Sequence, residues 1–315
     1  MINTFSKVAI ASVISLMLCV GAATAAGESD DRLTLSIGLY TSSKPSSMVT
    51  KFRPIISTLE KSVSKRLGKK VRIRMQIAKN YQKGIEYLAD GKVDFARFGP
   101  ASYVQAKTEN PEIQILAIES KNGTKVVNGI IVTGLYSSIQ ELSDLKGQSF
   151  AFGDMQSTSG RYMAQQYLMR HGIGAKDLSR YEYLGRHDIV GSKVSVGDFT
   201  AGAMSEADFR RMLAEGAKIR ELARFPMVSK PWVSRAGIDP EVYSALKLSL
   251  LELEKTEALI PLDFNGFING SNKDYRVIAD SMNQNRHFFS DDDRRPVEWV
   301  LASSKNKDSK AIKEK

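Results

Sequence analysis

The fold of this chain is decided by the stretch Phe150-Ala151-Phe152-Gly153-Asp154-Met155-Gln156-Ser157-Thr158-Ser159-Gly160-Arg161-Tyr162-Met163. Its pattern predicts a short buried strand, a tight loop of hydroxyl residues and then a helix. Backbone N–H groups at a helix N-terminus lie beside the positive end of the helix dipole and form an anion site. Three consecutive hydroxyls can each donate a hydrogen bond to a tetrahedral oxyanion, and Gly160 lets the backbone approach a ligand closely.

A simpler interpretation of this loop is that Ser157 or Ser159 only caps the helix. An isolated Ser-Thr-Ser-Gly sequence favours that interpretation. The choice between a cap and an anion site therefore depends on the rest of the chain.

The N-terminal residues 1–26 predict a signal peptide and a periplasmic location. Lys7 precedes an apolar run from Val8 to Val20, and small residues follow at Ala23-Thr24-Ala25-Ala26. The run is too short for a membrane span. The remaining chain, in a protein of 315 residues with 42% hydrophobic and 25% charged residues, is long enough for two soluble domains.

The only cysteine, Cys19, lies inside this predicted leader. Because the large Leu18 precedes it, we expect no lipoprotein anchor there. A mature chain without cysteine needs no disulfide, which suits a large periplasmic domain with a sufficient core.

The net charge of the chain is +10, and removal of Lys7 leaves +10 − 1 = +9. Small anions are natural partners for such a protein. The lysine-rich residues 303–315 contain no aromatic residues on which bases could stack. We therefore expect no nucleic-acid partner, and we interpret residues 291–315 as a polar, flexible C-terminal tail.

Strand and helix patterns alternate in the first part of the mature chain. The predicted elements are strands at 33–40, 71–77 and 93–98 and helices at 52–67 and 81–89. This alternation indicates a largely parallel sheet covered by helices, in which ligands sit beyond the carboxyl ends of the strands. Tyr40 and the Gly99-Pro100 turn fall at that edge.

Four segments occur in an order that is typical of one family. They are Ile37-Gly38-Leu39-Tyr40 followed by Pro45 and Ser46, Gly91-Lys92-Val93-Asp94-Phe95-Ala96-Arg97-Phe98-Gly99-Pro100-Ala101-Ser102-Tyr103, Ser157-Thr158-Ser159-Gly160, and Gly185-Arg186-His187-Asp188. In order and spacing they resemble the PhnD-type phosphate, phosphite and phosphonate substrate-binding proteins of ABC importers. The resemblance covers Leu33 to Asn285.

The resemblance implies an α/β fold of the type II periplasmic binding protein class, with two α/β lobes joined by two crossover strands and a ligand cleft between them. It implies that lobe 1 consists of residues 27–127 plus 228–290 and that lobe 2 consists of residues 128–227. The crossings are expected near 127–132 and near 224–233.

The resemblance also implies a small oxyanion ligand, namely a phosphonate, phosphite or phosphate, and an ABC permease as partner. Family members hold the oxygens of the anion with the hydroxyl loop and the histidine, and bring tyrosines from the other lobe. Carried across, the expected ligand-binding residues are Tyr40, Gly99, Tyr103, Ser157, Thr158, Ser159 and His187. We expect a monomer without enzyme activity, metal or cofactor.

Two departures leave the identity of the oxyanion open. Thr200 stands where the family often has an acidic residue before a glycine-containing strand, and Arg161 follows Gly160 where an uncharged residue is common. Glu206, just after that strand, is the candidate to meet an amino group on the ligand.

Two other functions remain as alternatives. The same fold could act as a sensor that presents its closed form to a membrane partner. An exported hydrolase could use Ser157 and His187 with Asp188, but no Gly-x-Ser-x-Gly elbow frames the serine. Adjacent His187 and Asp188 also point in different directions on most backbones, and we expect Asp188 to cap a helix or to pair with Arg186.

Overall fold

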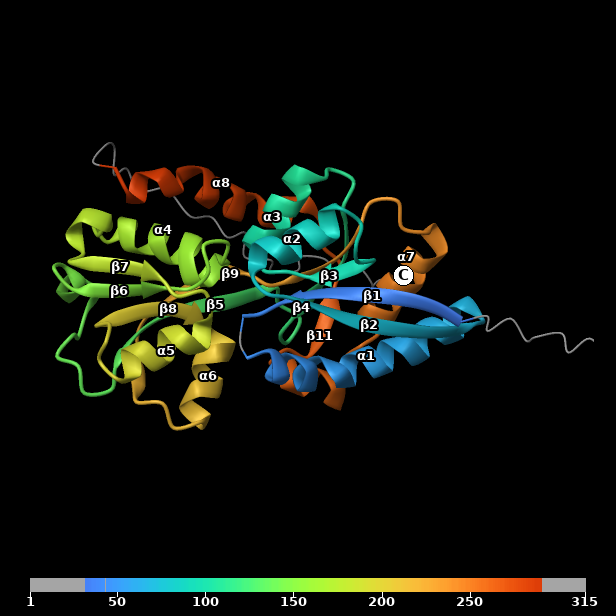
Figure 1. Ribbon diagram of the computed structural model, residues 1–315, viewed down its shortest axis with the longest axis horizontal. Helices are drawn as coiled ribbons and strands as arrows, with labels where there is room; N and C mark the ends of the chain where they lie inside the picture. The colour runs from blue at the N-terminus through green and yellow to red at the C-terminus, as the bar shows by residue number, and fades with distance from the viewer. Residues whose placement is uncertain (1–31, 43, 291–315) are drawn as a thin grey trace, which may run out of the picture. The chain divides into compact units, whose positions relative to one another are not determined.

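The computed structural model describes residues 32–42 and 44–290, and Figure 1 shows their helices and strands. The predicted signal peptide at 1–26, with Cys19, and the predicted tail at 291–315 lie outside the described residues. The described residues contain two β-sheets with helices packed on them.

The first sheet has the strand order β11-β4-β10-β3-β1-β2. Its strands are β1 (Arg32–Tyr40), β2 (Lys70–Ala78), β3 (Phe95–Arg97), β4 (Gln114–Ser120), β10 (Pro231–Ser234) and β11 (Gly266–Ile268). Strand β1 runs parallel to β2 and β3, so its last residue, Tyr40, lies at the carboxyl edge opposite Ala78. The sequence patterns had indicated neither β10 nor β11, because both are short.

The two faces of this sheet bury side chains against different helices. Leu35, Ile37 and Leu39 of β1 pack in a core with α1 (Pro45–Leu67) and α7 (Pro240–Leu251). On the opposite face, Tyr40 packs with α2 (Tyr81–Ala89) and α3 (Pro100–Glu109). Figure 1 shows α1 on one side of β1 and β2, with α2 and α3 on the other. This alternation along β1 places the Tyr40 ring beside the start of α3.

The second sheet has the strand order β7-β6-β8-β5-β9. Its strands are β5 (Val126–Gly134), β6 (Ser149–Phe152), β7 (Arg180–Tyr183), β8 (Ala201–Ser205) and β9 (Ile219–Val228). The helices that accompany it are α4 (Met163–Arg170), α5 (His187–Ser195), α6 (Glu206–Ala214) and α8 (Arg276–Gln284). Phe150 and Phe152 of β6 are buried with α4, whereas Ala151 faces the core that α5 and α6 cover.

Both sheets are mixed. In the first sheet β1 runs parallel to β2 and β3, as the alternating pattern predicted, but the strand that the chain adds later is antiparallel. Strand β10 runs antiparallel between β3 and β4, and β5 runs antiparallel to both β8 and β9. The cause is the path of the chain, which leaves the first sheet after β4 and returns to it through β10. Strands β5 and β9 pair over their length, with Val126 opposite Val228, so the outward and the return path lie side by side.

Candidate functional site

A small cavity lies where the carboxyl edge of the first sheet meets the hydroxyl loop of the second. Its walls include Tyr40 and Gly99 from the first sheet and its loops, and Ser157, Thr158, Ser159 and His187 from the second. Its volume is about 40 Å³, which exceeds the roughly 10–15 Å³ that one water needs but is far below the roughly 300–1,000 Å³ of drug-sized ligand sites. The cavity therefore fits a group of a few heavy atoms.

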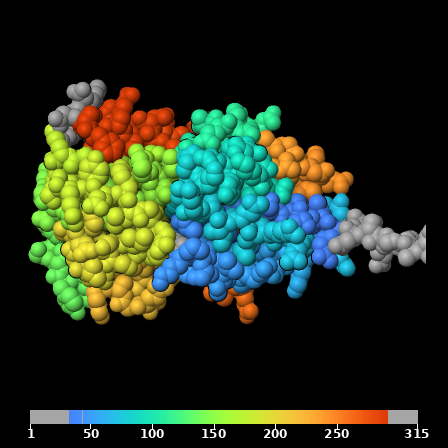
Figure 2. Space-filling view, in the orientation of Figure 1, coloured from blue at the N-terminus to red at the C-terminus, as the bar shows by residue number. Residues whose placement is uncertain are grey.

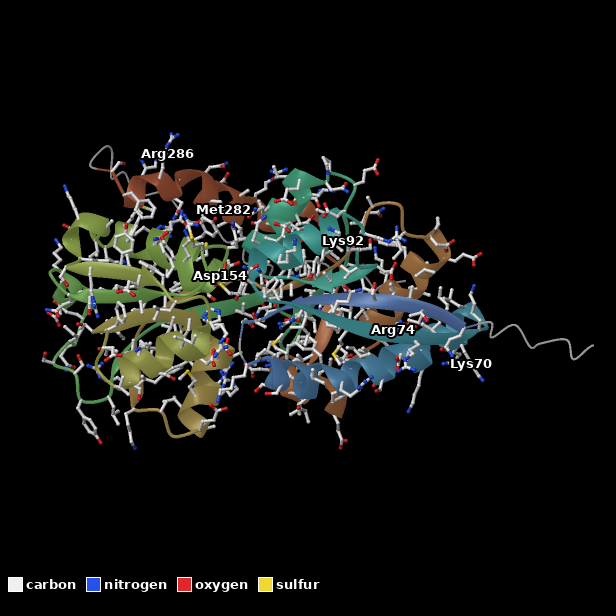
Figure 3. The ribbon with its side chains drawn as sticks, viewed as in Figure 1. Lys70, Arg74, Lys92, Asp154, Met282 and Arg286 are labelled. Carbon is white, nitrogen blue, oxygen red and sulfur yellow. The ribbon has the colours of Figure 1, made fainter. Side chains whose placement is uncertain are left out.

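The hydroxyl loop follows strand β6 and begins with Gly153 and Asp154, the latter labelled in Figure 3. Residues Thr158–Tyr162 form one wide π-helical turn that continues directly into α4. Ser157 is the N-cap of this turn, because its Oγ accepts a hydrogen bond from the Gly160 N–H at 3.0 Å. The capping interpretation is thus confirmed for Ser157. The cap does not exclude a second role, since Ser157 also lines the cavity.

The three hydroxyl side chains of the loop are only 2–4% exposed. The Thr158 Oγ1 accepts a hydrogen bond at 2.8 Å from the N–H of Ala101, in the first turn of α3. Because the Thr158 hydroxyl accepts this bond, its own proton can be donated to an acceptor in the cavity. The amides of Thr158 and Ser159 are also the first of their helix, where an N–H has no acceptor within the helix.

Glycine is required at position 160 for close packing rather than for an unusual backbone angle. A Cβ on Gly160 would lie 3.0 Å from the Gly153 Cα and 3.0 Å from the His187 Cε1. The N–H of Gly153 donates to the Gly160 carbonyl at 2.8 Å, so the two segments touch through their backbones. The sequence predicts that Gly160 lets the backbone approach a ligand closely, and in the structure Gly153 and His187 lie beside it.

Tyr40 closes the first-sheet side of the cavity. Its hydroxyl accepts a hydrogen bond from the Gly99 N–H at 2.5 Å and lies 3.2 Å from the Ser102 Oγ. Its ring stacks on Tyr81 with the centroids 3.9 Å apart. Burial raises the pKa of Tyr40 to about 12, so the phenol stays protonated. Tyr40 is therefore a fixed hydroxyl at the cavity wall.

His187 begins helix α5 and is 3% exposed. Its backbone N–H donates to the Ser42 carbonyl at 3.3 Å, and its ring bonds to the backbone of Ala203. The Nδ1 atom is buried and has no partner within the described residues. Burial lowers the pKa of His187, so the imidazole is neutral at pH 7 and can donate only one N–H.

The acidic neighbour of His187 does not complete a hydrolase triad. Asp188 binds Arg186 through two hydrogen bonds, with its Oδ1 3.0 Å from Nε and its Oδ2 3.1 Å from Nη2. The predicted pairing of Asp188 with Arg186 is confirmed. The guanidinium holds the Asp188 carboxylate, so it cannot orient the imidazole.

Three cationic side chains that the sequence analysis had not selected line the same cavity. They are Lys51 from α1, Arg97 from β3 and Lys230 from the turn between β9 and β10. Glu119 accepts from the Arg97 Nε at 2.5 Å and from its Nη2 at 3.0 Å. Burial, together with the nearby positive charge of Arg97, lowers the pKa of Lys230 to about 8. Arg97 lies in the segment from Gly91 to Tyr103 that resembles the family, but no local sequence pattern predicted that Lys51 or Lys230 would line a site.

One carboxylate, Asp208 of α6, also lines the cavity. The Ser205 hydroxyl donates to its Oδ2 at 2.6 Å. Burial raises the pKa of Asp208, but His187, Lys51, the Ser205 hydroxyl and Arg211 together hold the pKa below its ordinary value. The cavity therefore combines a charged carboxylate with a larger number of cations.

A family model described as "ABC transporter, phosphonate, periplasmic substrate-binding protein" matches residues 37–275. The chain belongs to this family. The family assignment places the protein in the periplasm, among the substrate-binding proteins of transporters rather than among enzymes, as predicted.

The chain is similar in sequence to two curated proteins. The first is named "Probable ABC transporter phosphite binding protein PhnD1" of Prochlorococcus marinus. It is 27% identical over 240 residues, which are 70% of this chain and 80% of that protein. The second is the "Phosphate-import protein PhnD" of Mycolicibacterium smegmatis. It is 24% identical over 230 residues, which are 68% of this chain and 70% of that protein.

Solved structures confirm the predicted type II periplasmic binding fold. PhnD1 from Prochlorococcus marinus in complex with methylphosphonate has a TM-score of 0.71 and 22% identity, covering 80% of this chain and 98% of that one. A binding protein component of an ABC phosphonate transporter from Pseudomonas aeruginosa has a TM-score of 0.71 and 17% identity, covering 82% of this chain and 88% of that one.

The structure places two expected family site residues outside the small cavity. The Tyr103 hydroxyl donates to the Asn272 Oδ1 at 2.5 Å, and its ring packs edge-on against Tyr275. Glu206 binds Arg224 at 2.7 Å and lines a second, larger cavity. Tyr40, Gly99, Ser157, Thr158, Ser159 and His187 do come together around the small one.

Within residues 32–42 and 44–290, no helix has the length and apolar character needed to cross a membrane. The same residues contain no cluster of three histidine, cysteine, aspartate or glutamate side chains placed to hold a metal ion. Arg161, the unusual residue after Gly160, turns away from the cavity and donates to the Asn285 Oδ1 at 2.9 Å.

We expect Gly160→Ala to lower the free energy of unfolding by about 1–3 kcal/mol, because the new methyl group overpacks against Gly153 and His187. Gly134→Ala is the matched control, since its Cβ would lie at an ordinary 3.6 Å from the Val194 carbonyl. That control should change the free energy by no more than about 0.5 kcal/mol. Urea unfolding of both variants measures the difference, and equal effects would contradict the packing argument.

We expect the ligand-free protein to become more stable relative to Lys230→Met as pH rises from about 8 towards 10. The folded state holds the pKa of Lys230 at about 8, against 10.5 as its ordinary value, so the unfolded state binds more protons in this window. Arg97 and Lys51 add to this lowering, whereas Glu119 and Asp208 oppose it. Urea unfolding at pH 8 and pH 10 measures the free energy of unfolding of both proteins. If the two free energies change equally with pH, Lys230 has an ordinary pKa.

Proposed function

We propose that this protein binds a small tetrahedral oxyanion, namely a phosphonate, phosphite or phosphate, in the small cavity and delivers it to the permease of an ABC importer. The observation that carries the proposal is the convergence of three buried hydroxyls and the first amides of a helix on a cavity of about 40 Å³. Hydroxyls and backbone N–H groups can both donate hydrogen bonds to the oxygens of an anion.

The proposed binding residues are Tyr40, Gly99, Ser157, Thr158, Ser159 and His187. Thr158 and Ser159 would supply hydroxyl and amide donors, and Tyr40 a phenol from the opposite side. Because a neutral His187 gives its one N–H to the Ala203 backbone, the buried Nδ1 could accept a hydrogen bond from a protonated ligand oxygen. Tyr103 and Glu206 are not part of this proposed set, because their side chains bind other groups.

Closure of the two sheets around the ligand is the proposed step that makes the protein competent for transport. Direct bonds already join the two sides, from the Ala101 N–H to Thr158 and from the Gln156 Nε2 to the Gln82 Oε1 at 3.3 Å. Figure 2 shows the surface of the yellow residues of the second sheet meeting the blue and cyan residues of the first along a seam. A ligand that contacts both sides favours this closed state over an open one.

The names of the relatives support the ligand class, since one is a phosphite-binding and the other a phosphate-import protein. We further propose that residues 1–26 are removed as a signal peptide, and that lobe 1 (27–127 plus 228–290) and lobe 2 (128–227) move as the two closing bodies. We also propose that the protein is a monomer.

The test of this function is isothermal titration calorimetry of the purified protein with phosphate, phosphite, methylphosphonate and 2-aminoethylphosphonate. We expect saturable heat and a raised melting temperature with at least one of them, because a ligand that binds only the folded state stabilises it. The absence of both signals with all four ligands would contradict the proposal.

We expect Ser157→Ala and Ser159→Ala each to weaken oxyanion binding by about 1–3 kcal/mol, the cost of a lost hydrogen bond to a charged group. Only Ser157→Ala should also lower the stability of the free protein, by about 0.5–2 kcal/mol, because it removes the N-cap. Calorimetry and urea unfolding separate the two effects.

The control for these variants is Ser192→Ala, an exposed serine of α5 that does not line the cavity. It should change neither affinity nor stability measurably. Unchanged affinity in Ser159→Ala would show that this hydroxyl does not touch the ligand.

A further inference from the structure

The charges around the cavity are not balanced. Lys51 and Lys230 both line it, and neither ammonium group forms a hydrogen bond or an ion pair at contact distance with a described residue. The third cation, Arg97, is already bound by Glu119 through two hydrogen bonds. Both lysines are half-buried, and a partly desolvated ammonium group without a contacting counter-charge favours an anionic partner.

A second, larger cavity of about 300 Å³ adjoins the first. The two cavities share five wall residues, which are Ser205, Ala207, Met227, Lys230 and Leu262. Lys230 thus stands between the place proposed for the oxyanion and a space large enough for an organic substituent on it.

The carboxylates of the larger cavity are all engaged by cations. Glu119, Glu206 and Asp263 line it. Their respective partners are Arg97 at 2.5 Å, Arg224 at 2.7 Å and Lys121 at 3.0 Å. None of these acids is left to bind a positively charged group on a ligand.

The carboxylate of the small cavity is engaged as well. Asp208 accepts from the Ser205 hydroxyl at 2.6 Å and lies 3.3 Å from the Arg211 Nη2. The charge that remains unmatched across both cavities is therefore positive, and it lies on Lys51 and Lys230.

We propose that the site is built for an oxyanion whose substituent carries a second anionic group, such as a phosphonocarboxylate, and that Lys230 and Lys51 bind this second group. This inference rests on the proposed function and specifies its ligand class. The hydroxyl loop holds the phosphonate oxygens, and the substituent extends past Lys230 towards the larger cavity. An ammonium group on the substituent would instead face two like charges.

The state of Lys230 in the free protein agrees with this arrangement. Burial lowers its pKa to about 8, and Glu119 and Asp208 only partly offset the effects of burial, Arg97 and Lys51. A ligand carboxylate would supply the counter-charge that the protein itself does not place beside this ammonium group.

The experiment compares two isosteric ligands at pH 7, phosphonoacetate and its uncharged amide, phosphonoacetamide, with methylphosphonate as the reference. Calorimetry on the wild-type protein should show phosphonoacetate binding at least tenfold more tightly than phosphonoacetamide, because a charge-assisted hydrogen bond is stronger than a neutral one. 2-Aminoethylphosphonate should bind more weakly than methylphosphonate.

Lys230→Met and Lys51→Met remove one ammonium group each and keep an unbranched side chain that is one heavy atom shorter. Each should reduce the affinity ratio of phosphonoacetate to phosphonoacetamide to below about threefold. Lys61→Met, an exposed lysine on the same helix as Lys51, is the control and should leave the ratio unchanged. Two separate lysine variants keep the test decisive if one of them fails to fold.

Three results would overturn the inference. A ratio near one in the wild-type protein would show that no second anion is recognised. Equal weakening of both ligands in the lysine variants would show that the lysines serve the phosphonate group itself. If methylphosphonate, phosphonoacetate and the phosphate ligands all fail to bind, the proposed function is overturned together with this inference. If methylphosphonate binds but phosphonoacetate is not preferred over phosphonoacetamide, only this inference is overturned.

Discussion

The structure depends on donors that are buried without an acceptor in their own helix. The first amides of the turn that starts at Thr158 have no intrahelical partner, and the hydroxyls around them are almost fully removed from water. Such groups are costly to bury unless something accepts their hydrogen bonds. Gly153 and Gly160 let the loop pack tightly on His187, and the Ala101 amide of α3 adds one more donor, which gives its hydrogen bond to the Thr158 Oγ1.

The sequence predicted this half of the site because its signals are local. A strand, three hydroxyls, a glycine and a helix follow one another within fourteen residues, and the end of β1 identified Tyr40 by the rule for parallel strands. His187 came from a turn motif recognised by resemblance to the family. The mixed sheets were missed because strand direction depends on where the chain crosses, and β10 and β11 are too short to show a period.

The cations and Asp208 were not predicted, and the reason is again physical. Lys51 lies in a long amphipathic helix, Lys230 in a crossing segment and Arg97 in a three-residue strand, so only the tertiary fold brings them together. Tyr103 is a different case. It is near the start of α3, as expected, but its ring packs towards Tyr275 rather than into the cavity. A residue's position in an element thus predicted its neighbourhood but not the direction of its side chain.

The unmatched ammonium groups beside the cavity also bear on the receptor when it carries nothing. Bringing the two halves together around water alone would move Lys51 and Lys230 out of bulk solvent without supplying a counter-charge. That penalty disfavours the closed form of the ligand-free receptor, and it disappears once an anionic ligand is bound. A permease that docks only the shut form would then hydrolyse no ATP on unloaded carriers, so the same two lysines would guard the importer against futile cycling.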